Sequence, residues 1–199
     1  MALKRFKRRT ILGTITIVIV VAGLGQIAVG FLFPSSPPTS GKILQSTSTS
    51  GGFSISHPEQ WAFRETPRGY QGDSTVVAFI VYPNLPKLGI DIVIRRPNIP
   101  YDSAEAVAEM GEQTARKQQG YRELSMERST AGDEETLLRE YVWLTPATPL
   151  QSSQPRQCLD NYRLHNRIAY ILTLCVDTED FSAVKPTFQQ MIENFTYLD

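Results

Sequence analysis

Cysteine and histidine are scarce in this sequence, with two of each among 199 residues. Such a small set excludes a multi-cysteine zinc module, and the spacing matches no ligand pattern for a single metal site. An excess of charge of one sign is also lacking, because 20 basic residues balance 20 acidic ones. This balance argues against a nucleic-acid binder. A hydrophobic fraction of 41% argues against a disordered chain and indicates one ordinary domain with accessory segments.

Acidic residues are absent from the first 33 positions, where every charge is positive. The basic residues are Lys4, Arg5, Lys7, Arg8 and Arg9. They precede residues 11–33, in which Gln26 is the only strongly polar side chain. At about 1.5 Å per residue this segment spans a hydrocarbon core of about 30 Å. We therefore predict a transmembrane helix at 11–33, with residues 1–10 in the cytoplasm because basic flanks stay inside.

A cleaved signal peptide is the alternative for this segment. Its apolar region would be 11–22, and Ala28-Val29-Gly30 would be its cleavage site. The apolar run continues through Phe31-Leu32-Phe33, past that site, which favours the transmembrane helix. Both interpretations place the remainder outside the cytoplasm, in a periplasm, in a lumen or at a cell surface.

Residues 34–52 have few apolar side chains and are rich in Pro, Ser, Thr and Gly. Such a stretch buries too little apolar surface to order itself, so we predict a flexible linker. Residues 34–199 carry 15 basic and 20 acidic side chains. An acidic domain is not attracted to an anionic lipid surface. We expect the helix, rather than charge, to hold the domain at 53–199 near the membrane.

The pattern from residue 53 onward is that of short strands separated by turns. We expect an opening hairpin of 53–58 with 61–64, then strands at 74–82 and 89–95 that end near prolines. Two further hairpins are expected, 121–129 with 136–144 and 157–163 with 168–176.

Two helices accompany these strands. Residues 102–119 begin with Asp102 or Ser103 as a cap, stop at Gly120 and present an apolar face of Ala106, Val107, Met110 and Thr114. The last helix has an apolar stripe of Phe188, Met191, Ile192 and Phe195, with Pro186 in its opening turn. Runs of strands with segregated helices indicate an α+β fold, an antiparallel sheet flanked by helices.

The register of the final hairpin predicts a disulfide. If the turn is centred between Asn166 and Arg167, Cys158 lies directly opposite Cys175, and Leu159 lies opposite Leu174. Directly opposed residues have Cα atoms close enough for a disulfide, which persists outside the cytoplasm. The alternative is a pair of buried free cysteines.

Both ends of the domain resemble the PsbP-like family. Residues 52–61 (GFSISHPEQW) are similar to the start of these domains, and 168–173, Asp180-Phe181 and 188–195 resemble their closing strand and helix. The resemblance covers about 53–199 and implies the Mog/PsbP fold, an antiparallel sheet between helices. It implies either a lumenal accessory or assembly factor of a photosystem complex or a membrane-tethered domain. The family is linked to calcium and manganese handling, but no ligand carries over to a residue here.

Candidate chemistry is limited to isolated side chains. The sequence contains no nucleophile elbow, zinc-protease pair or phosphate loop. The weak candidates are His57 and His165 as bases or ligands, 133–135 as a cation site, Arg95, Arg96 and Arg167 for an acidic partner, and Asn194 in a glycosylation sequon. Each is more simply a solvated surface residue. We therefore predict no catalytic residue, no metal ligand and no cofactor.

Two functions are compatible with these features. The first is a non-catalytic, membrane-tethered extracytoplasmic interaction module, an accessory or assembly factor that binds a protein partner in a photosystem-like membrane complex. The second is an extracytoplasmic sensor domain that binds a small ligand or a metal. An enzyme is disfavoured because no nucleophile and base come together in the sequence.

Overall fold

The computed structural model describes residues 41–66, 74–81, 91–97, 99–131, 134–148 and 152–198. The predicted helix at 11–33 and its basic flank lie outside these residues. Within the described part of the chain, neither helix is long and apolar enough to cross a membrane.

Ten strands and two helices make up the described residues. In chain order they are β1 (Ile43–Ser48), β2 (Phe53–Pro58), β3 (Ala62–Glu65), β4 (Ser74–Val81), β5 (Asp91–Pro97), α2 (Ala104–Ala115), β6 (Arg122–Ala131), β7 (Glu134–Leu144), β8 (Pro155–His165), β9 (Ile168–Asp177), α3 (Thr178–Glu193) and β10 (Thr196–Tyr197).

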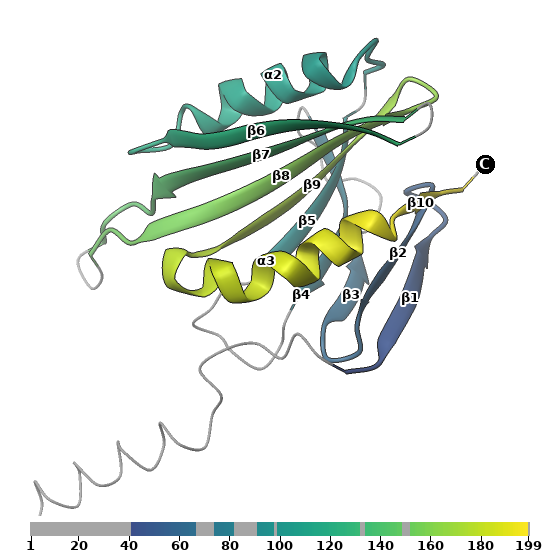
Figure 1. Ribbon diagram of the computed structural model, residues 1–199, viewed down its shortest axis with the longest axis horizontal. Coiled ribbons are helices and arrows are strands. Elements are labelled where there is room, and N and C mark those ends of the chain that lie inside the picture. Colours follow the sequence, from purple (N-terminus) through teal and green to yellow (C-terminus); the bar gives the residue numbers. More distant parts are fainter. Residues whose placement is uncertain are drawn as a thin grey trace, which may run out of the picture. The chain divides into compact units, whose positions relative to one another are not determined.

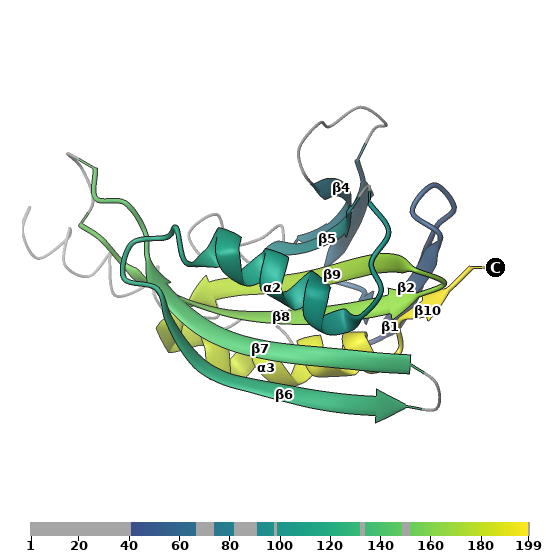
Figure 2. The same ribbon diagram turned by 90° about the horizontal axis from the view of Figure 1, so that it is seen from above.

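The strands form two antiparallel sheets. The larger has seven strands in the order β3-β4-β5-β9-β8-β7-β6, and the smaller has the order β1-β2-β10. Figure 1 and Figure 2 show α2 on one face of the larger sheet and α3 on the other, with the smaller sheet beside α3. The α+β prediction and the hairpins β6–β7 and β8–β9 are confirmed.

The main core lies on the α3 side of the larger sheet. Phe181, Val184, Phe188 and Met191 recur along one face of α3 and are buried against the sheets. Phe188 is 0% exposed, and burying such a side chain stabilises the fold by about 2–3 kcal/mol. The predicted apolar stripe is therefore confirmed for this helix.

The α2 side has a smaller core in which close approach depends on small residues. Ser103 caps α2 by accepting a hydrogen bond from the Ala106 backbone N–H at 3.2 Å. Ala104, Val107 and Ala108 are buried against the sheet, whereas Thr114, predicted on this face, is exposed. A Cβ at Gly111 would lie 2.5 Å from the Tyr162 hydroxyl, so α2 packs against Tyr162 at a position where it has no side chain.

The predicted opening hairpin is wrong. β2 pairs with β1 and β10, whereas β3 pairs with β4 in the larger sheet. A tight turn does follow β2, where the Trp61 N–H donates to the Pro58 carbonyl at 2.9 Å. The chain then crosses between sheets because Phe53, Ile55 and Trp61 are all buried in the core that the sheets share.

Two boundaries also differ from the predictions. Ile43–Ser48, assigned by sequence to the flexible linker, form β1 and pair along their whole length with β2. Pro186 lies inside α3 rather than in its first turn, because the helix begins at Thr178. The buried side chains of Phe181 and Val184 extend the apolar face of α3 toward its N-terminus and account for the earlier start.

Candidate functional site

A cavity of about 240 Å³ lies between α2 and the seven-stranded sheet. Its walls come from the C-terminal half of α2 and from β5, β7, β8 and β9. The polar and aromatic side chains that line it include Arg95, Thr114, Tyr141, Trp143, Asp160 and Tyr162.

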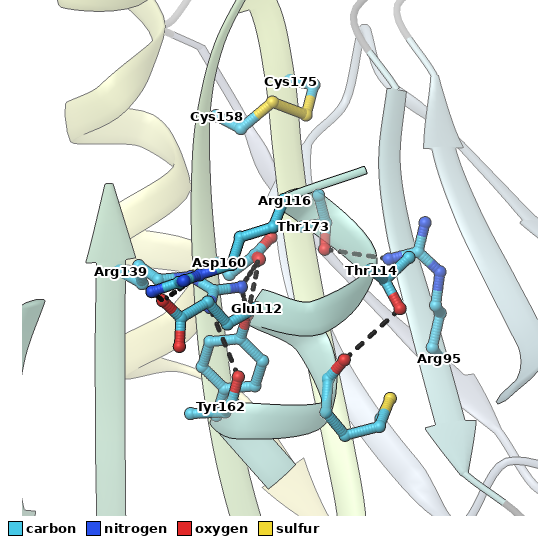
Figure 3. Close-up of polar contacts among 12 residues, drawn as sticks. Arg95, Glu112, Thr114, Arg116, Arg139, Cys158, Asp160, Tyr162, Thr173 and Cys175 are labelled. Atoms are coloured by element: carbon cyan, nitrogen blue, oxygen red, sulfur yellow. Dashed lines mark hydrogen bonds and ion pairs between the residues drawn. A yellow bond between two sulfur atoms is a disulfide. The ribbon is translucent and has the colours of Figure 1, made fainter. Parts of the chain in front are cut away.

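Asp160, which lines this cavity, forms a buried ion pair with Arg139 (Figure 3). The side chains of Arg139 and Asp160 are 1% and 6% exposed, and Arg139 Nη2 lies 3.1 Å from Asp160 Oδ2. The Tyr162 hydroxyl donates to the same oxygen at 2.6 Å and accepts a hydrogen bond from Arg139. Arg139 Nη1 donates to the Ala108 carbonyl of α2 at 3.3 Å. The pair therefore ties α2 to β7 and β8.

The charge states of this cluster follow from its surroundings. Burial disfavours the charged guanidinium, but Tyr162 and Asp160 outweigh that effect and raise the pKa of Arg139. Burial and the charge of Asp160 raise the pKa of Tyr162 above its ordinary value of 10.0. At neutral pH, Arg139 is a cation and Tyr162 is a neutral hydrogen-bond donor.

Two polar atoms in this cluster lack partners. Asp160 Oδ1 and Arg139 Nε are buried and form no hydrogen bond with any described residue. A buried polar atom without a partner costs about 1–3 kcal/mol, so natural proteins have few of them. Asp160 also lines the cavity, so its carboxylate combines a buried oxygen that lacks a partner with a position beside the cavity.

Arg95 supplies a second cation to the same cavity. Its Nη1 donates to Thr173 Oγ1 at 3.2 Å, and no ion pair joins it to a carboxylate among the described residues. Arg95 lies opposite Ile171, while Thr173 lies opposite Asp160 on the next strand. In Figure 3, Thr173 lies between Arg95 and Asp160.

The disulfide predicted from the hairpin register borders this cavity. Cys158 and Cys175 are bonded, their Cα atoms are 4.2 Å apart, and they occupy the predicted opposed positions. Cys175 lines the cavity, and Trp143 Nε1 donates to Cys158 Sγ at 3.1 Å. The bridge therefore helps to hold Trp143 in the cavity wall.

Neither histidine lines this cavity. His57 is buried, with Nε2 2.8 Å from Ser46 Oγ and Nδ1 2.9 Å from the Pro58 carbonyl oxygen. This Ser-His contact across β1 and β2 was not anticipated from the sequence. The cavity beside it is only about 10 Å³, room for about one water molecule. His165 stacks on Tyr197, with ring centroids 4.1 Å apart.

The remaining sequence candidates take part in local contacts. Arg167 pairs with Asp102 at 2.7 Å, both well exposed, and Arg96 donates to the Gly51 carbonyl at 3.4 Å. Arg96 and Arg167 line a second cavity of about 380 Å³. Glu134 accepts a hydrogen bond from Tyr197, Glu135 pairs with Arg128, and Asp133 lies outside the described residues. Asn194 ends α3 and is exposed.

Arg139, Asp160 and Tyr162 were not predicted from the sequence. One signal was available, because Leu137, Arg139 and Tyr141 alternate along β7 and therefore share one face. Leu137 and Tyr141 are buried, and Arg139 is buried with them. An arginine between two apolar positions of a half-buried strand indicates that buried hydrogen-bond partners face it, and here they include the carboxylate of Asp160.

Comparisons with known proteins identify the fold. No family model and no curated protein matches this chain. The solution structure of cyanobacterial PsbP (CyanoP) from Synechocystis sp. PCC 6803 is 12% identical, with a TM-score of 0.58 over 83% of this chain and 96% of that chain. LpqN of Mycobacterium tuberculosis, described as involved in cell envelope biogenesis, is 12% identical, with a TM-score of 0.53 over 80% of this chain and 93% of that chain. The domain therefore has a PsbP-like fold, as the resemblance of its two ends predicts.

Proposed function

We propose that this protein is a non-catalytic accessory module, tethered outside the cytoplasm by its N-terminal segment, that binds a subunit of a larger membrane complex. The CyanoP-like fold supports an accessory role by analogy only. The disulfide Cys158–Cys175 supports an oxidising compartment, where such bonds persist. The basic flank before the apolar segment 11–33 supports the orientation.

Strand β6 is the observation that carries the interaction with a protein partner. It is ten residues long and lies at one edge of the seven-stranded sheet, paired only with β7 among the described strands (Figure 2). Its outer backbone N–H and C=O groups are therefore available for pairing with another chain. An extended segment of a partner would add there as a further strand.

The side chains of β6 fit this interpretation. Leu124 and Met126 are 39% and 46% exposed, and both lie on this edge strand. A bulge between Glu123 and Ser125 places Leu124 outside the regular pairing with β7, and such bulges are common at sheet edges. The edge thus combines free backbone groups with apolar anchors for a partner strand.

A site-specific crosslink tests this partner surface. A photo-crosslinking residue replaces Met126 in the tagged full-length chain, and Gln113, an exposed residue of α2, is the matched control position. Capture from native membranes after gentle detergent extraction should give one stoichiometric membrane-complex subunit at position 126 and none at 113. Leu124→Lys should weaken that capture. Equal capture at both positions, capture of a second copy of this chain, or no capture would refute the partner proposal.

The tether is tested separately. In sealed membrane vesicles of known orientation, the full-length chain should resist alkaline extraction, and protease should reach the disulfide-bonded domain only from the side opposite the cytoplasm. Extraction at alkaline pH would contradict a membrane-spanning segment. Digestion of the domain from the cytoplasmic side would contradict the orientation.

Binding of a small ligand is the second candidate function. It is favoured by one observation, a cavity lined by Asp160, whose buried Oδ1 has no hydrogen-bond partner among the described residues.

A further inference from the structure

We propose that the cavity between α2 and the sheet binds a small hydroxy-carboxylate with an apolar body. This binding site is separate from the partner surface proposed on β6 and does not depend on it. Three features of the cavity support the proposal, namely its charge, the spacing of its polar groups and the nature of its remaining wall.

The charge of the cavity favours a monoanion. Arg139 and Asp160 compensate each other at 3.1 Å. Arg95 adds one positive charge and has no carboxylate partner among the described residues, since its guanidinium bonds to the neutral hydroxyl of Thr173. A single carboxylate would neutralise this excess and form a charge-assisted hydrogen bond with the guanidinium, a planar donor suited to carboxylates.

The unpartnered oxygen of Asp160 favours a neutral donor on the same ligand. Asp160 is 4% exposed, lines the cavity and already receives Arg139 and Tyr162 on Oδ2, which leaves Oδ1 to accept a further hydrogen bond. A ligand hydroxyl supplies that bond without charge. A ligand ammonium would place a second cation beside Arg139, which like-charge repulsion disfavours.

The strand register places the two polar groups on the same side of one cavity. Arg95 bonds to Thr173, and Thr173 is the direct partner of Asp160 on the neighbouring strand. Adjacent strands are about 4.8 Å apart, and only β9 separates β5 from β8, so Arg95 and Asp160 lie on strands about 10 Å apart. Two hydrogen bonds of about 2.8 Å each leave room between them for an α-hydroxy acid.

Much of the remaining wall is apolar or aromatic. Met110, Ala115, Ile171, Tyr141 and Trp143 line the cavity around the polar pair. Thr114 and Gln118, also in the lining, are exposed on the α2 side, so the cavity opens to solvent there. A short branched hydrocarbon fits such a wall, and few polar groups fix its orientation, as in most small-molecule sites.

Tryptophan signals test this proposal, because the chain has only two tryptophans. Trp143 lines the cavity, whereas Trp61 is buried in the core on the α3 side. Proton–nitrogen correlation spectra of the purified full-length chain are recorded during titration with α-hydroxyisocaproate. The indole signal of Trp143 should shift and saturate, while that of Trp61 stays in place.

Matched ligands and variants identify the groups responsible. Isocaproate lacks the hydroxyl and α-hydroxyisocaproamide lacks the charge, so each should bind at least about tenfold more weakly than α-hydroxyisocaproate.

Variants of the cavity test the same groups on the protein. Arg95→Gln should weaken binding of α-hydroxyisocaproate by a similar factor, whereas Arg64→Gln, at an exposed residue of β3, should not. Thr114→Phe should block the opening, and Gln113→Phe, one residue away on α2, should not.

Several outcomes would overturn the proposal. The first is no shift of Trp143 with α-hydroxyisocaproate at up to about 10 mM, a concentration that detects even millimolar affinity. The others are equal shifts of both tryptophans and unchanged affinity in Arg95→Gln. An unchanged Trp61 signal in each variant shows that the fold is retained, so that a loss of binding is assigned to the cavity.

Discussion

At the scale of single residues, Arg139 and Asp160 form a buried ion pair whose side chains are 1% and 6% exposed. Removing one partner leaves the other charge buried without compensation, which costs about 3–5 kcal/mol. We therefore expect Arg139→Met to lower the free energy of unfolding by this amount, measured by urea denaturation. Arg122→Met, at an exposed residue of β6, should change it by at most about 0.5 kcal/mol.

A double variant separates the charge from the packing. Arg139→Met combined with Asp160→Leu removes both charges, and apolar replacement of a buried ion pair is often close to neutral. The double variant should therefore be more stable than Arg139→Met alone. A loss equal to or larger than the sum of the two single losses would show that packing around α2, rather than the uncompensated charge, accounts for the effect.

At the scale of elements, the hairpin β8–β9 depends on its disulfide. Cys158 and Cys175 are 17 positions apart, and a bridge that closes a loop of this length stabilises a fold by about 3 kcal/mol. We expect Cys158→Ala with Cys175→Ala to lower the free energy of unfolding by about that amount in urea. Reduction of the unmodified chain should have a similar effect, while reductant should leave the double variant unchanged. A double variant as stable as the parent would contradict this prediction.

Helix α3 contains a proline that the fold tolerates at a cost. Pro186 is exposed and has no N–H to donate to the Ser182 carbonyl one turn earlier. Pro186→Ala restores that hydrogen bond but raises the entropy of the unfolded chain, so we expect a net gain of about 2 kcal/mol in the free energy of unfolding. Ser182→Ala, also exposed, should change it by at most about 0.5 kcal/mol. A loss of stability would mean that the packing of α3 depends on the proline.

The sequence predicts these elements unevenly, for physical reasons. β8 and β9 have a local turn and opposed cysteines, so their register follows from neighbouring residues. β1 has two adjacent apolar residues, Ile43 and Leu44, followed by four polar ones, so it lacks the alternation that predicts a strand, and its pairing with β2 is not visible in its own sequence. The residues of the turn after β2 are the same whether the chain folds back on β2 or crosses to another sheet. The prediction of an opening hairpin was wrong for this reason, since β3 pairs with β4.

At the scale of the whole molecule, the candidate site could not be predicted from local patterns. Arg95, Asp160 and Trp143 come from β5, β8 and β7, and α2 covers them. Only the complete sheet order, in which β5 lies next to β9, brings Arg95 near Asp160. The alternation on β7 indicates a buried arginine, but its acidic partner follows from long-range pairing alone.

Tyrosines with raised pKa values make the free energy of unfolding depend on pH in the alkaline range. Burial is the main cause that raises the pKa of Tyr141, Tyr162, Tyr170 and Tyr197 above the ordinary value of 10.0. Well below pH 10 these tyrosines are neutral in both the folded and the unfolded chain, so their burial makes its full contribution to the free energy of unfolding there. As the pH rises from about 10 toward the folded-state pKa values, the unfolded chain releases these protons first. Each group then destabilises the fold by about 1.4 kcal/mol per pH unit.

Tyrosinate absorbance during an alkaline titration checks this expectation. The chain has eight tyrosines. We expect the buried Tyr141, Tyr162 and Tyr170 and the half-buried Tyr197 to titrate only with cooperative loss of the fold, followed in parallel by circular dichroism. In denaturant all eight should titrate together near pH 10. Tyr162→Phe removes one of the four and should make the remaining stability less steeply dependent on pH above 10. Simple titration of all eight tyrosines near pH 10 with the fold intact would contradict the burial of these hydroxyls, and with it the closed packing of α2 and α3 on the sheet.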